Sequence, residues 1–352
     1  MKLVTFSVNT PVGEMRRLGA LLDGTFEGPI VDLTAAYATF LATETDEPTP
    51  RELAALRTPP DMIGWLRGAH RSREAADQAL DFVRRRTHAT VGLDGARLTY
   101  RREDVRLLAP LPRPASIRDF SIYEEHMSLA EPPSPKRPAW YRYPPYYKGN
   151  PDSMIGPEDP IPYPYYTKKL DLEPEIGIVV GRAGRNLTIE QARAHIAGYT
   201  IFIDCSARDG HEREPLGPSK RKDFCNVLGP CLVTADELDD MNLRVRVIVD
   251  GEVWFDGHSG YKRNFTAAQL VAFASDNETL QPGDLLGTGT VGLGCSMDIH
   301  KWPQVGQTFT VEMEGIGSLT HRIVAGDQVV DYVLNGMDGL VPVPESMVAG
   351  KQ

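Results

Sequence analysis

The sequence lacks the features that mark several classes of protein. Its four cysteines, at positions 205, 225, 231 and 295, are widely spaced and form no Cys-x-x-Cys pair. Neither a disulfide framework nor a zinc knuckle is therefore indicated, and we expect reduced, mostly buried thiols. No run of 18 apolar residues and no apolar core of signal-peptide length is present. We therefore expect a cytoplasmic protein without a transmembrane helix.

Positive charge is also in short supply. The 352 residues carry a net charge of -10, and the isoelectric point is near 5.4. Such a chain offers no basic face to a nucleic-acid backbone or to an anionic membrane, so neither is an expected partner. The content of 41% hydrophobic and 24% charged residues is that of an ordinary globular protein. A small molecule is the expected ligand.

Turn-forming residues and short apolar runs predict a strand-dominated α+β fold with two domains. The 32 glycines and 28 prolines favour many turns over a helical bundle. Residues 1–108 are predicted to form a small amino-terminal α/β domain, and residues 109–352 the larger one. The expected elements of the first domain are strands at 2–8 and 96–100 and helices at 51–66 and 72–85. Three alternating prolines make 109–114 a non-helical linker.

Local signals place further elements in the larger domain. Thr188 with Gln191, and Thr266 with Gln269, have the form of capping boxes, so each pair should open a helix. The pair Asp250-Gly251 lies between two apolar runs and predicts a β-hairpin. The Pro- and Tyr-rich segment 132–166 has two interpretations, an extended surface loop or a loop that covers a substrate.

Three acidic residues are predicted to lie close together. Glu173 and Glu175 flank Pro174 at the entry to an apolar strand, 176–180, and residues i and i+2 of a strand point to the same face. Asp204 follows the apolar strand 199–203, where its side chain can leave the strand into a cleft. Like charges about 4 Å apart cost roughly 4 kcal/mol per pair at an effective dielectric near 20, so the cluster needs a cation or protons. Oxygen ligands favour Mg²⁺, Mn²⁺ or Ca²⁺ over Zn²⁺, unless these acids merely face solvent.

Other residues offer acid-base and charge-stabilising groups. Asp119 is a possible fourth ligand of a hard metal ion, and His126 is a candidate general base, with a satisfied surface or core histidine as the alternative. Arg208 and Lys222 lie among acidic residues, and spacing alone leaves two roles open. They can form structural ion pairs, or they can hold a developing oxyanion.

The run Gly287-Thr-Gly-Thr-Val-Gly292 fits the Gly-x-Gly-x-x-Gly pattern of dinucleotide sites. A dinucleotide site would need a helix directly after it, and the following residues predict none, so we reject a nucleotide cofactor. The run instead indicates a loop of close backbone approach. Its hydroxyls, on Thr288 and Thr290, are available to a carboxylate ligand.

Together these residues resemble the fumarylacetoacetate hydrolase superfamily, over a stretch from about Arg118 to Leu319. Leu170-Asp-Leu-Glu-Pro-Glu-Ile-Gly resembles its Glu-x-Glu metal strand, and Ile203-Asp-Cys-Ser-Ala-Arg-Asp resembles its Asp-x-Ser-Ala-Arg-Asp motif. Leu280-Gln-Pro-Gly-Asp, followed by Thr288-Gly-Thr, resembles a third motif. The seven-residue step from Asp119 to His126 is similar to the fumarylacetoacetase branch.

The resemblance implies a mixed β-roll, a homodimer and a divalent cation, usually Mg²⁺. The implied metal ligands are Asp119, Glu173, Glu175 and Asp204. His126 is implied as the base, with Arg208 and Lys222 on the oxygens of the substrate. Tyr147, in a Tyr-x-Gly segment, and Thr288 are implied to contact the substrate.

Two positions depart from the family pattern. The family orients its base with a glutamate three residues later, where this chain has Leu129, or from the segment after the Thr-Gly loop, where the nearest acid is Asp298. His211 replaces a polar residue three positions after the arginine and is expected to change substrate recognition.

The expected reaction is hydrolysis of a carbon-carbon bond in a small diketo acid or acylpyruvate-like compound. Oxo-acid decarboxylation and keto-enol isomerisation, which use the same metal-bound enolate, are the alternatives within enzymes. A catalytically silent, metal-stabilised module is the alternative from another class.

Overall fold

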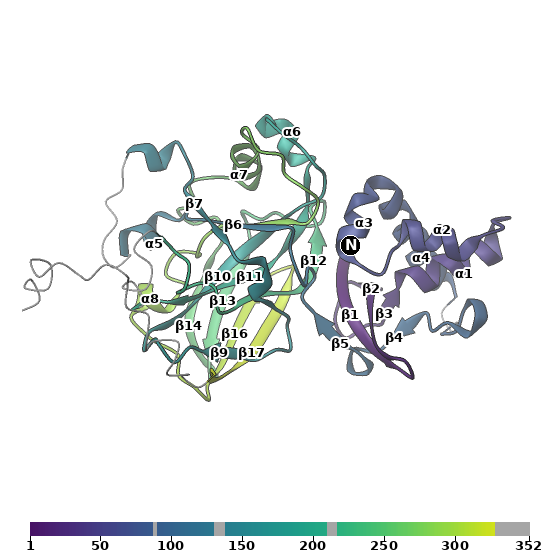
Figure 1. The fold of residues 1–352 in the computed structure, drawn as a ribbon, viewed down its shortest axis with the longest axis horizontal. Helices are drawn as coiled ribbons and strands as arrows, with labels where there is room; N and C mark the ends of the chain where they lie inside the picture. The colour runs from purple at the N-terminus through teal and green to yellow at the C-terminus, as the bar shows by residue number, and fades with distance from the viewer. Residues whose placement is uncertain (87–89, 130–137, 210–216, 328–352) are drawn as a thin grey trace, which may run out of the picture.

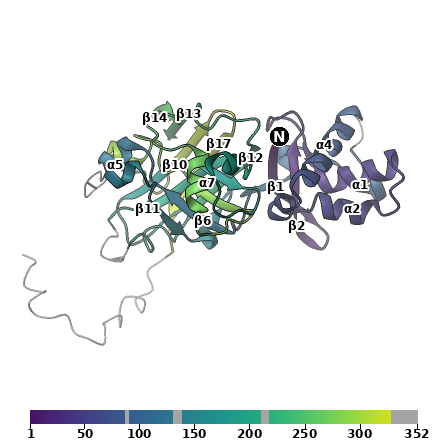
Figure 2. The ribbon, with the colours of Figure 1, turned by 90° about the horizontal axis from the view of Figure 1, so that it is seen from above.

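The structure, a computed structural model, describes residues 1–86, 90–129, 138–209 and 217–327. Two regions lie side by side in it, the amino-terminal residues and a larger strand-rich body, and both views show them adjacent (Figures 1 and 2). The described residues form two mixed β-sheets with helices at their margins, so the predicted strand-dominated α+β fold is confirmed.

The amino-terminal region combines four α-helices with antiparallel strands that form one end of the larger sheet. Its elements are β1 (Lys2–Thr10), β2 (Gly13–Leu21), β3 (Ile30–Asp32), α1 (Leu33–Glu44), α2 (Pro50–Arg57), α3 (Met62–Arg67), α4 (Ala69–Arg85), β4 (Thr99–Tyr100) and β5 (Arg106–Leu108). The helix predicted at 51–66 is two helices, because Pro59 and Pro60 interrupt it. Sequence analysis missed α1, which is apolar on most sides and so lacks the periodic polar face of a surface helix.

The larger body contains the remaining strands and four short helices. They are β6 (Ser116–Phe120), α5 (Glu124–Leu129), β7 (Tyr146–Gly149), β8 (Met154–Ile155), β9 (Ile161–Tyr163), β10 (Leu170–Val180), α6 (Ile189–Arg193), β11 (Ile196–Ala207), β12 (Asn226–Thr234), β13 (Arg244–Val249), β14 (Glu252–His258), α7 (Ala267–Ala274), β15 (Asp284–Gly287), α8 (Ser296–Ile299), β16 (Thr308–Met313) and β17 (Gly317–Ala325). The described part of the Pro- and Tyr-rich segment therefore contributes strands and is no structureless loop.

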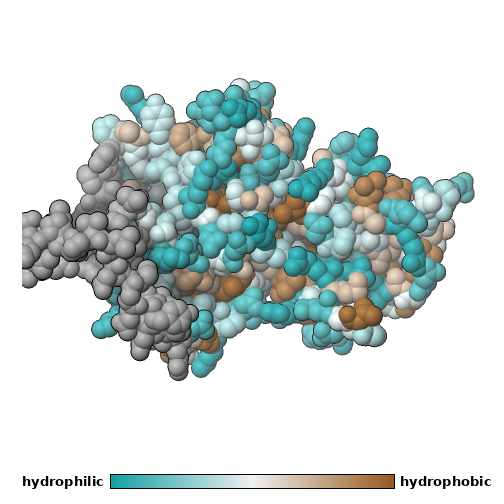
Figure 3. Space-filling model, viewed as in Figure 1, coloured by the Kyte–Doolittle hydropathy of each residue, from teal (hydrophilic) through white to brown (hydrophobic). Residues whose placement is uncertain are grey.

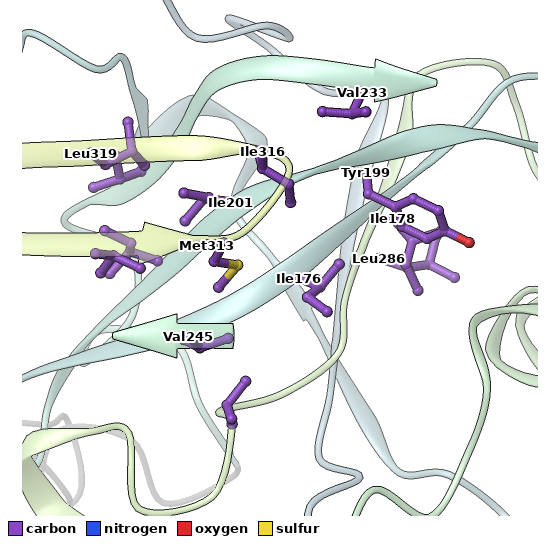
Figure 4. Close-up of a cluster of buried hydrophobic side chains, with 14 of the residues drawn as sticks. Ile176, Ile178, Tyr199, Ile201, Val233, Val245, Leu286, Met313, Ile316 and Leu319 are labelled. Atoms are coloured by element: carbon purple, nitrogen blue, oxygen red, sulfur yellow. The ribbon is translucent and has the colours of Figure 1, made fainter. Parts of the chain in front are cut away.

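The two sheets differ in size and in strand order. The larger runs in the order β4-β3-β2-β1-β12-β11-β10-β15-β6-β7, with β5 on β1 and β8 on β12. The smaller runs β14-β13-β16-β17-β9. Side chains from both sheets gather in one cluster (Figure 4), whose labelled members include Ile176, Ile201, Val245, Met313 and Leu319. Each such aliphatic side chain, once fully buried, contributes about 1.5–3 kcal/mol to folding.

The predictions that rest on local sequence signals, two capping boxes and one hairpin, are confirmed. Thr188 and Gln191 form a capping box at α6, and Thr266 and Gln269 form one at α7. The Asp250-Gly251 hairpin joins β13 to β14, and both residues have positive φ, 48° and 85°. This is the conformation that matches the twist of a tight hairpin.

The predicted strands at 176–180 and 199–203 are correct in place but too short. They are the second half of β10 and the middle of β11, two strands that pair along nearly their whole length. Glu173 and Glu175 thus lie within a strand instead of at its entry, and Asp204 does not mark a strand end. The acidic side chains are tolerated there because residues 170–175 alternate apolar and acidic side chains, apart from Pro174.

The connection between the two regions is packed. β1 pairs with β12 through Lys2 with Val233 and Leu3 with Leu232, so the large sheet crosses from one region into the other. Within the predicted linker, Pro110 is buried and its carbonyl accepts a 2.8 Å hydrogen bond from the Thr5 hydroxyl. The division between residues 108 and 109 stays a prediction.

The surface shows no dominant apolar region on the face in Figure 3, where hydrophobic residues form small patches among hydrophilic ones. Among the helices of the described residues, none has the length and apolar character needed to cross a bilayer. All four cysteines are buried and free, as predicted.

Candidate active site

Acidic side chains gather on one face of the large sheet. Glu173 is paired directly with Asp204 across β10 and β11, and Glu175 follows two residues later on the same face. β6, which pairs with β15, supplies Asp119. One carboxylate oxygen from each of Asp119, Glu175 and Asp204 lies within 4.8 Å of the other two, and all three residues are buried.

The protein compensates these three carboxylates only in part, through Lys222 and Tyr147 at Asp204 and through the Gly289 amide at Glu175. Burial raises the pKa of each one well above its ordinary value, and the neighbouring carboxylates raise it further. The Oδ1 atom of Asp119 has no hydrogen-bond partner among the described residues. A buried, unpaired oxygen in a cluster of like charges fits a ligand of a hard cation, because such a cation would supply both the partner and the opposite charge.

The end of β15 and the loop after it approach this cluster so closely that only glycine fits. A side chain at Gly287 would collide with Glu175 and would place its Cβ 2.8 Å from Asp119 Oδ1. At Gly289, where φ is +83°, the amide donates a 2.9 Å hydrogen bond to Glu175 Oε2. The glycine-rich run is thus a close-approach loop, as predicted, but it serves a carboxylate cluster.

Glu173 has a different environment from the other acids. Its Oε2 accepts hydrogen bonds from Lys222 (2.7 Å) and Ser206 (3.0 Å), and its Oε1 lies 2.5 Å from both Arg208 Nη2 and the Thr290 hydroxyl. Burial alone would raise the pKa of Glu173, but Arg208 and Lys222 hold it well below its usual range. Lys222 also contacts Asp204, so one ammonium group bridges the two acids.

A histidine-aspartate pair stands beside Glu173. His126, on α5, has Nδ1 2.9 Å from Asp298 Oδ1 and Nε2 3.3 Å from Glu173 Oε1. Burial alone would lower the pKa of His126, but Asp298 and Glu173 raise it above its ordinary value. The Leu293 amide holds the other oxygen of Asp298 at 3.0 Å. Asp298, the nearest acid after the Thr-Gly loop, is therefore the acid that contacts and orients this histidine.

A cavity of about 450 Å³ opens onto these groups. Of the residues predicted from sequence, it is lined by Asp119, His126, Tyr147, Glu173, Glu175, Arg208 and Lys222. Tyr147, opposite Asp119 in the β6–β7 pair, donates a 2.9 Å hydrogen bond to Asp204 Oδ2. Such a volume suits a small organic acid.

Two predicted substrate contacts have other outcomes. Thr288 does not line the cavity: its hydroxyl accepts a hydrogen bond from the Ile176 amide and donates one to the Gly289 carbonyl. A substrate contact of Thr288 therefore stays a prediction, and Thr290 is the threonine of this loop that lines the cavity. His211 lies outside the described residues.

Sequence analysis missed Asp171. This fully buried residue lies on β10 on the same face as Glu173, and its Oδ2 accepts a 2.7 Å hydrogen bond from Arg208 Nε. The available signal was the spacing of two in Asp171-Leu-Glu173-Pro-Glu175, which continues the acidic alternation by one step.

The chain is similar in sequence to proteins that are named oxaloacetate tautomerases. The chain is 32% identical over 244 residues to the mitochondrial oxaloacetate tautomerase fahd2 of Xenopus laevis, which covers 67% of this chain and 74% of that protein. It is also 32% identical over 231 residues to the human mitochondrial oxaloacetate tautomerase FAHD2A, covering 63% of this chain and 71% of the relative.

Solved structures share the fold. Maleylpyruvate hydrolase from Sphingobium sp. SYK-6, solved with manganese(II) and pyruvate, superposes with a TM-score of 0.65 at 22% identity, covering 93% of this chain and all of that one. A 2-hydroxyhepta-2,4-diene-1,7-dioate isomerase from Mycobacterium marinum gives 0.62 at 22% identity, with the same coverage. Residues 116–324 match the family described as fumarylacetoacetate (FAA) hydrolase C-terminal. The chain therefore belongs to the fumarylacetoacetate hydrolase family.

Proposed function

We propose that this protein is a metal-dependent hydrolase that cleaves a carbon-carbon bond in a small diketo acid or acylpyruvate-like compound. The observation that carries the proposal is the His126–Asp298 pair, which turns a buried histidine of raised pKa toward the cavity. A base whose other ring nitrogen is held by a carboxylate is suited to take a proton from water. Hydrolysis requires such a base to activate water, in addition to the groups that stabilise an enolate.

The clustered carboxylates are proposed to hold the metal, and of these Asp119, Glu173 and Glu175 line the cavity while Asp204 lies behind its wall. Asp119, Glu175 and Asp204 would bind the divalent cation, with Glu173 as the fourth ligand predicted from the family motif. Mg²⁺ is the expected ion, and Mn²⁺ or Ca²⁺ would suit the same oxygen donors. When bound, the cation would act as a Lewis acid toward the substrate's oxo and carboxylate oxygens.

The protein's own groups would carry the proton transfers. His126 would accept a proton from water at Nε2, while Asp298 fixes its orientation through Nδ1. The resulting hydroxide would add to one carbonyl carbon, the bond from that carbon to the carbon between the two carbonyl groups would break, and the released enolate would take the proton back from His126. Arg208 and Lys222, both on the cavity wall, would neutralise the substrate's oxygens. The products are two acids.

Keto-enol tautomerisation is a second candidate, favoured by the names of the relatives at 32% identity. In that reaction His126 would move a proton between carbon and oxygen of one oxo-acid, and no water would be consumed. The assignment to the fumarylacetoacetase branch, the homodimer and the cytoplasmic location also remain proposals.

The test is turnover of a panel of acylpyruvates, fumarylacetoacetate-like diketo acids and oxaloacetate, with Mg²⁺ or Mn²⁺ and with EDTA. Wild type is compared with His126→Ala and with His321→Ala, a matched control. His321 is buried and bonds the Asp159 carbonyl, and it is absent from the cavity wall. We expect two acids from the wild type, an approximately 10²- to 10⁴-fold fall in kcat for His126→Ala, and no such fall for His321→Ala.

Each product pattern separates the candidates. Metal-dependent formation of two acids that disappears in His126→Ala supports the hydrolase. Metal-dependent interconversion of one acid without cleavage would replace it with the tautomerase. Cleavage that persists unchanged in His126→Ala would overturn the role given to the histidine.

A further inference from the structure

Asp171 connects two parts of the candidate site without touching the cavity. It is completely buried on β10, and it does not line the cavity wall. Its Oδ2 lies 2.7 Å from both Nε and Nη2 of Arg208, whose side chain reaches the cavity. Its Oδ1 accepts hydrogen bonds from the amides of Ser296 (2.7 Å) and Met297 (3.4 Å). One carboxylate therefore holds an arginine and the start of α8.

The start of α8 depends on this contact. The first amides of a helix have no partner within the helix and are usually satisfied by a capping side chain. The residue at the cap position is Cys295, and its side chain makes no capping hydrogen bond. Asp171 supplies the missing acceptor from a neighbouring strand, so it fixes where α8 begins.

The position of α8 determines whether Asp298 can contact His126. Asp298 belongs to this short helix and is two residues after Ser296. Its Oδ1 is the partner of His126 Nδ1 at 2.9 Å. A shift of the first turn of α8 would move this carboxylate and would change where the imidazole of His126 points.

The Arg208 guanidinium is the second group that Asp171 places. It is held between Asp171 and Glu173, and its Nη2 lies 2.5 Å from Glu173 Oε1. The planar guanidinium presents its donors in a fixed fork, so a carboxylate on one side sets the direction of the remaining donors. Without Asp171, Glu173 would be the carboxylate left to orient the group.

We propose that Asp171 is the positioning residue that holds the substrate-binding Arg208 and the His126–Asp298 pair in register. The inference rests on the proposed function, since it assigns both groups to one reaction. A carboxylate is required because both of its oxygens accept hydrogen bonds, one from Arg208 and one from the Ser296 amide. Asparagine could still accept from the Ser296 amide, but its NH₂ group would face the donors of Arg208.

The amino-terminal region offers a matched control, Asp32. This residue is also buried, accepts a helix-start amide (Ala35, 2.9 Å) and pairs with an arginine (Arg17 Nε, 3.5 Å), but it is absent from the cavity wall. Asp171→Asn and Asp32→Asn therefore remove the same kind of interaction at two places. We expect similar decreases in Tm, and a fall in kcat of about 10- to 100-fold for Asp171→Asn alone.

Two measurements do not depend on turnover. The first is the affinity for oxalate, a dianionic mimic of an oxo-acid enolate, measured by calorimetry with Mg²⁺ present. The second is amide hydrogen exchange in a peptide that contains Ser296 and Met297. In Asp171→Asn we expect at least 10-fold weaker oxalate binding and faster exchange in that peptide, and in Asp32→Asn neither change.

The outcomes distinguish this inference from the proposed function. Unchanged exchange at α8 together with unchanged oxalate affinity in Asp171→Asn would overturn the inference, whatever happens to turnover. Equal losses in both variants would also overturn it, because Asp171 would then be a general stabilising residue. If the wild type turns over no acid of the panel while the two local changes appear, the proposed reaction fails and the positioning role stands.

Discussion

The two regions of the molecule compensate buried carboxylates to different degrees. In the amino-terminal region, burial raises the pKa of Asp32, but the Ala35 amide and Arg17 act against that rise, and no second carboxylate adds to it. In the larger body, Asp119, Glu175 and Asp204 are placed together although burial and mutual repulsion raise the pKa of each. The first arrangement is what stability alone selects. The second destabilises the protein unless a cation is bound, and so it indicates function.

The same contrast separates the glycines of the two regions. Gly19 in β2 is packed against backbone and side chains of neighbouring strands, so it serves packing. Gly287 is confined by the oxygens of Asp119 and Glu175. A close approach therefore has a functional meaning only when the group it approaches has one.

Removal of the metal should have the largest effect, because it affects the acidic cluster of the larger body and leaves Asp32 unchanged. We expect EDTA to abolish turnover, and Mg²⁺ at about 100 times its Kd to raise the free energy of unfolding by about 2.7 kcal/mol. In Asp119→Asn this increment should disappear, and the metal-free variant should be at least as stable as the wild type because one like charge is removed. Thermal unfolding with and without Mg²⁺ measures both, with Asp32→Asn as the control that keeps the increment. A wild-type Tm that does not change when Mg²⁺, Mn²⁺ or Ca²⁺ is added would contradict the metal site.

Substitution of Asp298 by asparagine should have the next largest effect. The amide cannot hold the His126 ring in the same tautomer or stabilise its protonated form, so we expect kcat to fall by about 10²- to 10⁴-fold. Steady-state kinetics at saturating substrate and Mg²⁺ is the measurement. Tm should change by only a few degrees. A variant with wild-type kcat would show that the 2.9 Å contact is structural only.

Alanine at Gly287 and at Gly19 should separate function from stability. At Gly19 the new Cβ would lie 2.7 Å from the Val31 carbonyl oxygen, and at Gly287 it would lie 2.8 Å from Asp119 Oδ1. Each substitution overpacks a closed site and should reduce the free energy of unfolding by about 1–3 kcal/mol. Only Gly287→Ala should also weaken Mg²⁺ binding, measured by calorimetry. Equal Mg²⁺ affinities in the two variants would argue against a cation between these oxygens.

The smallest predicted effect concerns one of the ion pairs that link the two regions. Arg73, on α4, lies 3.2 Å from Asp236, which follows β12. Partial burial opposes ionisation of Asp236, but hydrogen bonds from Thr234 and Arg73 lower its pKa from 3.8 to about 2. A lowered pKa stabilises the fold above pH 3.8, and the contribution is lost as the pH falls toward 2.

Because Asp236 is more than half exposed, its contribution should be below about 1 kcal/mol. Urea unfolding of wild type and Asp236→Asn should therefore differ by a constant amount from pH 7 to pH 5 and converge below pH 4. A difference that grows as the pH falls would have the wrong sign for this pair.

Several parts of the fold could be predicted because their causes are local. The capping boxes at Thr188 and Thr266 and the hairpin at Asp250-Gly251 use hydrogen bonds and φ angles within a few residues. Strand lengths were less accessible, since the apolar run at 176–180 is only the end of a strand that begins at Leu170. The first half of β10, residues 170–175, was missed because its residues alternate between apolar and acidic side chains instead of forming an apolar run.

The sequence by itself determined which chemical groups are available: two glutamates two residues apart, further acids at 119 and 204, a histidine and two cations. The tertiary structure alone decided their partners. Strand register placed Glu173 opposite Asp204, and chain folding brought Asp298 to His126 across 172 residues. It also turned Thr290, and not Thr288, toward the cavity and gave Asp171 its two contacts. The physical reason is that such contacts depend on the order and register of strands far apart in the chain, which no local pattern specifies.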